Sequence, residues 1–247
     1  MTAALATVES GAPDAPFVAL VHGSLDRMAG FAKLARRLEE HHRVLRFDRR
    51  GYARSLAAGP PFTIAQHATD LIDLLDGRPA VVLGHSLGGN VALAAAQRAP
   101  HLVRAAVVYE SPFSWQPWWP TATAGGAAVD GEPADAAERF LRRMIGDALW
   151  ERLPAATRAE RRAEGPALVG ELADLRAHAP WDPEAIAVPV VAARGEQGND
   201  HHRVGMRWLA DTLGCPLVEI AGARHGAHTS HPEAMAALVA QASALAA

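Results

Sequence analysis

Short runs of apolar and β-branched residues recur along the chain, and helical stretches lie between most of them. The runs do not alternate with polar residues, which indicates strands buried on both faces of a parallel sheet. We predict strands at residues 17–21, 44–47, 80–84, 105–109, 188–193 and 217–220. We predict helices at residues 31–40, 64–76, 88–99, 202–213 and 232–247. Strands that alternate with helices in this way are typical of an α/β fold.

One segment, residues 112–183, interrupts the alternation. It has no strand pattern, and proline, tryptophan and glycine separate a few helical stretches such as residues 134–145 and 168–177. We predict that it forms a helical cap inserted into a core made of residues 1–111 and 184–247. Five of the chain's six tryptophans lie in it: Trp115, Trp118, Trp119, Trp150 and Trp181.

Two interpretations of these tryptophans remain open. They could line an apolar site beneath the cap, in which case Trp115, Trp118 and Trp119 are candidates for substrate binding. Alternatively, a small helical layer simply needs aromatic anchors for its own packing.

Composition excludes several classes of partner. The 247 residues carry 24 Lys and Arg against 27 Asp and Glu, a formal net charge of −3, and 49% of them are hydrophobic. This is the profile of an ordinary globular protein, and its charge provides no positive field to hold nucleic acid or a membrane surface. No apolar run approaches the roughly 18 residues that a spanning helix requires. We expect a small-molecule substrate, no nucleic-acid partner and no membrane partner, and we leave the oligomeric state open.

The cellular compartment is inferred from cysteine content and from the first residues. Cys215 is the only cysteine, so neither an internal disulfide nor a cysteine-based zinc site can form. Residues 1–10 contain Glu9 and no basic residue, so they lack the charged region of a secretory signal. Both observations predict a cytoplasmic protein.

The clearest chemical signal is the sequence Gly84-His85-Ser86-Leu87-Gly88-Gly89, which follows a predicted strand and precedes an alanine-rich helix. In this context Gly-x-Ser-x-Gly predicts a nucleophile elbow, a tight turn that needs glycines and presents the serine at the strand's carboxyl end. The amino end of the next helix lies there, so the Leu87 N–H can donate to an oxyanion. We predict that Ser86 is a nucleophile; the alternative is a hydrolase fold that kept the turn without the activity.

These residues resemble the α/β-hydrolase superfamily, and the resemblance covers almost the whole chain. Val21-His22-Gly23-Ser24 is similar to the family's His-Gly loop, which implies that the Ser24 N–H is the second oxyanion donor. Residues 48–55 are similar to the family's Asp-x-x-Gly-x-Gly-x-Ser loop, with Ala53 where glycine is common. The resemblance implies a mostly parallel sheet of about six or seven strands, flanked by helices, with the cap after the family's sixth strand. Since few residues precede the first predicted strand, we expect the family's leading strand pair to be shortened.

The general base should be a histidine after the last strand, and His225 matches the family's catalytic position. Imidazole, with an unperturbed pKa of about 6.5, can take the Ser86 proton and return it to the leaving group. His228 and His231 follow at a spacing that metal ligands can have, but no matching carboxylate motif accompanies them. No nucleotide-binding motif is present either. We therefore expect no metal and no cofactor, and we expect His201 and His202 to start a surface helix.

Two carboxylates compete for the role of orienting the histidine. The family most often has Gly-x-x-Asp after the strand at 188–193, but Gly195-Glu196-Gln197-Gly198 has glycine at that position. Asp200 lies two residues later, in a loop that could still deliver it. Its rival is Glu110, at the end of the strand at 105–109, where some members, including haloalkane dehalogenases, carry their acid. We favour Glu110, since a strand end holds a side chain more rigidly than a loop does.

Together these residues predict a serine hydrolase that cleaves a small, uncharged or apolar ester, thioester or lactone through an acyl-enzyme on Ser86. A serine argues against haloalkane dehalogenase and epoxide hydrolase chemistry, which in similar folds uses an aspartate nucleophile. A cofactor-free perhydrolase or a C–C bond hydrolase could use the same triad. The missing aspartate motivates another hypothesis, a ligand-binding module of hydrolase fold that turns over slowly or not at all.

Overall fold

A seven-stranded sheet forms the centre of the molecule in the computed structural model, which describes residues 4–128 and 131–246. The strands are β1 (Thr7–Ser10), β2 (Phe17–Val21), β3 (Arg43–Phe47), β4 (Ala80–His85), β5 (Val103–Tyr109), β6 (Val190–Gly195) and β7 (Leu217–Ile220). Their order is β1-β3-β2-β4-β5-β6-β7; β1 pairs antiparallel with β3, and the other neighbours are parallel. The predicted α/β fold with a mostly parallel sheet is confirmed.

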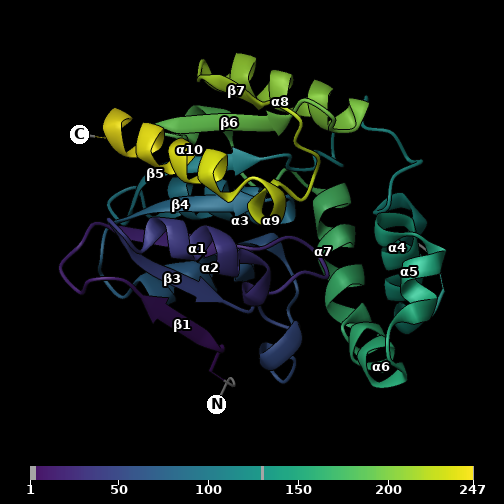
Figure 1. Ribbon diagram of the computed structural model, residues 1–247. Helices are drawn as coiled ribbons and strands as arrows, with labels where there is room; N and C mark the ends of the chain where they lie inside the picture. Colours follow the sequence, from purple (N-terminus) through teal and green to yellow (C-terminus); the bar gives the residue numbers. More distant parts are fainter. Residues whose placement is uncertain (1–3, 129–130, 247) are drawn as a thin grey trace.

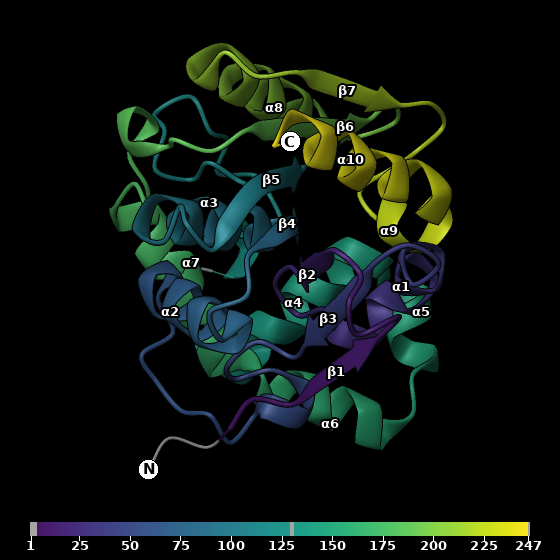
Figure 2. The same ribbon diagram turned by 90° about the vertical axis from the view of Figure 1, so that its left-hand side faces the viewer.

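Helices cover both faces of the sheet, as Figure 2 shows. One face carries α1 (Ala32–Leu38), α9 (Ala227–Ser230) and α10 (Pro232–Leu245), and the other carries α2 (Ile64–Leu75), α3 (Leu87–Arg98) and α8 (Asp200–Leu213). Short 3-10 turns occur at Met28–Phe31, Ala53–Ser55, Gly126–Ala128 and Pro183–Ala185. Because both faces are covered, all five residues of β2 are buried, which explains the uninterrupted apolar runs of the sequence.

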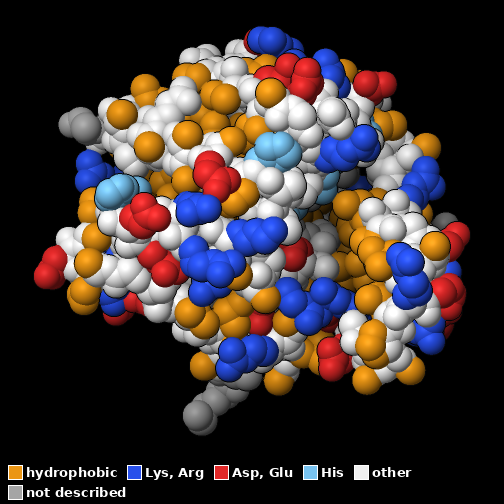
Figure 3. All heavy atoms as spheres, viewed as in Figure 1, with side chains coloured by type: hydrophobic (Ala, Val, Ile, Leu, Met, Phe, Trp, Pro, Cys, Tyr) orange, Lys and Arg blue, Asp and Glu red, His pale blue; other side chains and the backbone are white. Residues whose placement is uncertain are grey.

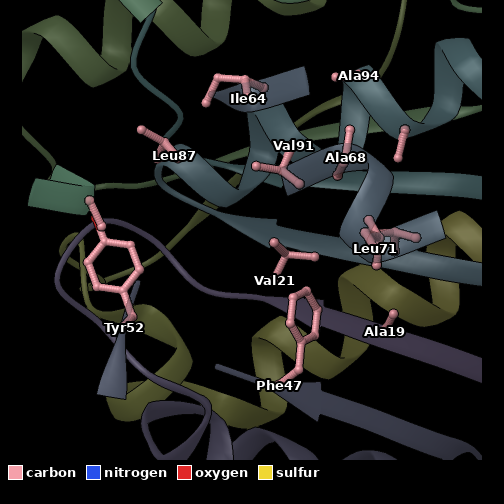
Figure 4. Close-up of a cluster of buried hydrophobic side chains, with 14 of the residues drawn as sticks. Ala19, Val21, Phe47, Tyr52, Ile64, Ala68, Leu71, Leu87, Val91 and Ala94 are labelled. Atoms are coloured by element: carbon pink, nitrogen blue, oxygen red, sulfur yellow. The ribbon is translucent and has the colours of Figure 1, made fainter. Parts of the chain in front are cut away.

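The chain between β5 and β6 contains the remaining helices and, in its described residues, no strand. These are α4 (Pro133–Ile145), α5 (Asp147–Arg152), α6 (Ala155–Ala163) and α7 (Gly165–Ala177), which lie together on the right in Figure 1. Leu141, Trp150 and Leu168 of these helices belong to the same buried cluster as Val21 and Ile64. Figure 4 shows the sheet and α2–α3 side of this cluster. The inserted helices therefore share one hydrophobic core with the sheet.

Strand β1 is the element that the sequence pattern does not reveal. It is a four-residue edge strand, Thr-Val-Glu-Ser, whose residues alternate between exposed and half-buried. It pairs antiparallel with β3 and is the one strand before β2 in the described residues. A short polar edge strand has no apolar run by which it could be recognised.

A buried ion pair joins the inserted helices to the sheet. Arg49 follows β3, and its Nη1 lies 2.7 Å from Oε2 of Glu171 on α7. Both side chains are almost fully buried. The Tyr52 hydroxyl donates to Glu171 Oε1 at 2.6 Å. Burial alone would raise the pKa of Glu171, but Arg49 and His67 outweigh it and hold this pKa below its usual value. The Glu171 carboxylate is therefore ionised, and Arg49 is the charge that balances it in the core.

We expect Arg49→Met to lower the free energy of unfolding by about 3–5 kcal/mol, because it leaves the buried Glu171 charge without its partner. Urea denaturation monitored by circular dichroism measures the change. The double variant Arg49→Met/Glu171→Met, which removes both charges, should recover part of the loss. A decrease below about 1 kcal/mol, the usual contribution of an exposed pair, would contradict this account.

Candidate active site

Ser86 occupies a strained turn between β4 and α3. Its backbone has φ 55° and ψ −129°, a conformation that non-glycine residues rarely adopt. The two flanking glycines leave no room for a side chain: a Cβ on Gly84 would lie 2.3 Å from the Gly88 carbonyl oxygen, and one on Gly88 would lie 2.2 Å from the Val21 carbonyl oxygen. The Ser86 N–H donates to the Tyr109 carbonyl at 2.8 Å, which ties the turn to β5. The local geometry is that of the expected elbow.

The loop after β2 lies directly against this turn. A Cβ added to Gly23 would lie 2.8 Å from the Ser86 Cβ. The Gly23 carbonyl oxygen is 2.7 Å from His22 Nδ1 and accepts from Arg49 Nη2 at 3.0 Å. His22 Nε2 accepts the Arg49 N–H, so Nδ1 carries the ring's hydrogen. In a trans peptide the next N–H points away from the carbonyl, so the Ser24 N–H points away from His22 and Arg49.

His225, in the loop after β7, meets the carboxylate of Glu110. Its Nδ1 lies 2.8 Å from Glu110 Oε2, while Glu110 Oε1 accepts the Gly195 N–H at 2.9 Å. Glu110 is fully buried at the end of β5 and has φ 47°, another strained conformation. Burial alone would raise the pKa of Glu110, but interactions with His202 and His225 outweigh it and lower this pKa below its usual value. Glu110 is thus an ionised carboxylate fixed by the strand end.

The rival carboxylate, Asp200, is the first residue of α8 and lines the same pocket as His225. No ion pair joins it to His225 in the described part of the chain, whereas Glu110 forms one. The space that the family's aspartate would need is taken by Glu110, since a Cβ on Gly198 would lie 2.3 Å from Glu110 Oε1. The glycine at position 198 and the glutamate at position 110 therefore fit each other sterically.

His202 is a residue whose position the sequence reasoning missed. We expected it on a surface helix, but it is 8% exposed, in the first turn of α8. Its ring stacks on His225 with centroids 4.6 Å apart and planes 6° apart, and its Nδ1 is 3.4 Å from Glu110 Oε2. Burial lowers the pKa of His202 to about 4, so its ring is neutral at pH 7. The packing of α8 beside β6 brings this histidine to Glu110.

Glu110, His202 and His225 offer ligand atoms within 4.8 Å of one another, a spacing that a metal ion can bridge. The Nδ1–Oε2 distance of 2.8 Å between His225 and Glu110 is instead that of a direct hydrogen bond. The arrangement fits a histidine that is oriented by a carboxylate.

A pocket of about 480 Å³ opens above Ser86 and His225. Ser24 lines it, and so do residues from α4, α7 and α8, among them Phe140, Leu172 and His201. Figure 3 shows a hollow between the inserted helices on the right and the rest of the molecule, bordered by hydrophobic side chains on the side of the inserted helices. A volume of this size suits a small organic ligand, for which pockets of about 300–1,000 Å³ are usual.

The three tryptophans suggested for substrate binding have different positions. Trp119 lines the pocket, but Trp115 and Trp118 do not. Trp115 packs edge-on against Phe113 and Trp181, and Trp118 packs against Trp208 with its side chain partly exposed. The place of Trp115 and Trp118 in an aromatic cluster favours the alternative of structural anchors, and a role in substrate binding stays a prediction for all three tryptophans.

None of the described helices is long and apolar enough to cross a bilayer. The expectations about nucleic acid, membrane surfaces and a cytoplasmic location stay predictions.

Comparisons with known proteins agree with this architecture. A solved enol-lactonase from Burkholderia xenovorans superposes with a TM-score of 0.75 at 24% identity, over 97% of this chain and 96% of that one. A solved hydrolase from Pseudomonas aeruginosa has a TM-score of 0.75 at 26% identity, over 96% of this chain and 93% of that one. The curated "Probable oxidoreductase EphD" of Mycobacterium tuberculosis is 36% identical over 90 residues. That match covers 34% of this chain and only 15% of the relative's length.

A family model described as "Alpha/beta hydrolase family" matches residues 18–238, which is most of the chain. The match includes the β2 loop, the Ser86 turn, Glu110 and His225. The resemblance inferred from the sequence motifs is confirmed: the chain belongs to the alpha/beta hydrolase family.

Proposed function

We propose that this protein is a serine hydrolase that cleaves a small, uncharged or apolar ester, thioester or lactone. The observation that carries the proposal is the convergence of Ser86 and His225 on one pocket, with the His225 Nδ1 paired to the ionised Glu110. A nucleophile, a base and a carboxylate in this relation form the triad of acyl-transfer enzymes.

In the proposed reaction, Ser86 Oγ attacks the substrate carbonyl and passes its proton to His225 Nε2. Glu110 accepts a hydrogen bond from Nδ1, which holds the imidazole in the tautomer that can accept at Nε2 and stabilises the imidazolium that forms. The imidazolium then protonates the leaving group, and an acyl-enzyme remains on Ser86. Water activated by His225 attacks the acyl-enzyme and releases the acid.

The oxyanion is proposed to be held by the backbone N–H groups of Ser24 and Leu87. Leu87 is the first residue of α3, where amide N–H groups have no partner within the helix. Supporting evidence for Ser24 is the orientation of its peptide, whose carbonyl side is fixed by His22 and Arg49. Two donors that are fixed before the reaction need no reorganisation when negative charge develops.

The inserted helices, within residues 112–183, are proposed to act as the cap that determines substrate size. Phe140, Leu172 and Trp119 contribute apolar side chains to one part of the pocket wall, which supports an apolar acyl group there, while Arg143 and Asp200 add charged side chains elsewhere in the lining. The enol-lactonase among the structural neighbours is consistent with a lactone as one substrate class. The pairing of Glu110 with His225 supports a hydrolase over a binding module, because it offers a carboxylate where the loop at 195–198 has none.

Trapping of the acyl-enzyme tests the proposal. We expect a burst of about one p-nitrophenolate per chain with p-nitrophenyl butyrate, and a butyryl mass increment on the peptide that contains Ser86 after acid quenching. Parallel rates with the acetate and octanoate esters measure how long an acyl chain the pocket accepts. Turnover without a label on Ser86 would contradict the serine mechanism, and no turnover of any ester would favour a C–C hydrolase, a perhydrolase or a binding role.

A further inference from the structure

A second cluster of histidine and carboxylate side chains lies outside the lining of the pocket. Asp26, His85 and His228 each offer one ligand atom, and these atoms lie within 4.8 Å of one another. Asp26 Oδ2 is 3.3 Å from His228 Nε2 and 4.0 Å from His85 Nδ1. Both histidines are buried, whereas the Asp26 side chain is 25% exposed. The cluster is thus compact and reachable from solvent on one side.

The hydrogen bond of His85 Nε2 leaves a lone pair on Nδ1 that can bind a cation. Nε2 lies 2.8 Å from the His225 carbonyl oxygen, and because a carbonyl only accepts, Nε2 carries the hydrogen. A neutral ring then has a lone pair on Nδ1, which is buried without a hydrogen-bond partner among the described residues. This lone pair faces the Asp26 carboxylate. Two acceptors oppose each other there, which is the arrangement that a metal ion between them stabilises.

Two of the three side chains, Asp26 and His85, are held as metal ligands usually are, whereas His228 Nδ1 is buried without a hydrogen-bond partner among the described residues. Asp26 Oδ1 accepts the Arg27 N–H at 2.8 Å, which leaves Oδ2 directed to the histidines. Metal-bound histidines almost always donate their second N–H to a carbonyl or carboxylate, as His85 donates to the His225 carbonyl.

The distances suit a four-coordinate ion after a small adjustment. Ligand atoms at 2.0–2.2 Å from a tetrahedral Zn²⁺ lie about 3.3 Å apart. The Asp26–His228 distance of 3.3 Å has this value, and the Asp26–His85 distance of 4.0 Å would need to shorten by about 0.7 Å. Asp26 belongs to a loop rather than to a helix or strand, so the shift requires no rearrangement of the sheet.

We propose that Asp26, His85 and His228 form a binding site for a divalent transition-metal ion of the zinc type. Imidazole and carboxylate ligands suit Zn²⁺, whereas Mg²⁺ prefers oxygen ligands alone. The exposed side of Asp26 gives the ion its entry and leaves a fourth position to water. The sequence did not suggest this site, because the carboxylate that His228 meets comes from the opposite end of the chain.

The position of the site gives it a structural consequence. Asp26 follows Ser24 by two residues, His85 directly precedes Ser86, and His228 follows His225 by three residues. One bound ion would therefore join the three segments that carry the proposed oxyanion donor, nucleophile and base. An ion that binds the folded state and not the unfolded chain stabilises the folded state by mass action. Zinc should therefore raise the melting temperature of the protein.

Isothermal titration of the EDTA-treated whole chain with zinc chloride tests the site. We expect one Zn²⁺ per chain in the wild type, and a weakening of the affinity by at least about 10-fold in Asp26→Asn and in His228→Gln. His231→Gln, which changes a neighbouring histidine outside the cluster, is the matched control and should bind zinc as the wild type does. Magnesium chloride should produce neither binding heat nor a melting shift.

Absence of zinc binding in the wild type, or unchanged affinity in both variants, would overturn the proposal. Loss of binding in His202→Gln instead would place the ion on the Glu110 cluster and overturn it as well. Melting in EDTA checks that each variant folds; Asp26→Asn, at a partly exposed loop position, provides the test where His228→Gln does not fold. Ser86→Ala should bind zinc with wild-type affinity, so failure of the hydrolase proposal is distinguishable from failure of this one.

Discussion

Replacement of Ser86 by alanine should lower kcat/KM for p-nitrophenyl acetate by about 10⁴-fold or more. The variant lacks the Oγ nucleophile, so no acyl-enzyme forms, and only binding and the two oxyanion donors remain to promote attack by water. The fold should persist, because serine and alanine both carry a Cβ and the strain of φ 55° is the same for each. Initial rates at neutral pH and thermal denaturation of both proteins measure the two expectations.

Ser114→Ala is the matched control for this result. Ser114 lines the same pocket and has no role in the proposed mechanism, so its loss should leave the rate within about threefold of the wild type. If Ser86→Ala kept more than about a tenth of the wild-type rate, the proposed nucleophile would be wrong. A parallel loss in both variants would indicate a general sensitivity of the pocket instead.

The features that could be predicted are those whose sequence pattern is determined by residues close together in the chain. Residues 17–21 form an apolar run because β2 is covered on both faces, and the predicted strand bounds match the observed ones. The turn at Ser86 needs glycines on both sides, so its motif is visible in six consecutive residues. The preference for Glu110 over Asp200 also rested on a local feature, its place at the end of a strand, and the role of Glu110 stays a prediction.

The parts that could not be predicted depend on contacts between distant segments. His202 meets Glu110 only because α8 packs beside β6, and His228 meets Asp26 only because helix α9 and the loop after β2 come together. The tryptophans give the same lesson: Trp115 and Trp119 are close in sequence, yet one packs against Trp181 and the other lines the pocket. Residue type suggested the same role for both tryptophans, but packing gives them different positions.

Glu110→Gln should lower kcat for the same ester by about 10³- to 10⁴-fold while the fold is retained. Both carboxylate oxygens face N–H groups, Oε1 that of Gly195 and Oε2 the Nδ1 of His225. The amide of glutamine has one acceptor oxygen and one donor NH₂ group, so it cannot accept from both N–H groups. If its NH₂ faces His225, Nδ1 must accept, Nε2 must carry the hydrogen, and the ring can no longer take the proton of Ser86. Steady-state rates with circular dichroism of the variant test this.

Asp200→Asn is the matched control, since Asp200 is the other carboxylate considered for the triad and lines the same pocket. Its kcat should stay within about threefold of the wild type; a loss as large as that of Glu110→Gln would contradict the assignment of the acid.

The steric fit between positions 110 and 198 allows a sharper test. With the larger side chain removed, Glu110→Ala/Gly198→Asp opens the space for an aspartate on the other loop, and we expect it to regain at least about 10-fold of the rate lost in Glu110→Ala. Recovery would mean that the reaction needs a carboxylate at His225 Nδ1, whether it comes from position 110 or from position 198. In this chain the carboxylate would then come from Glu110, directly after β5.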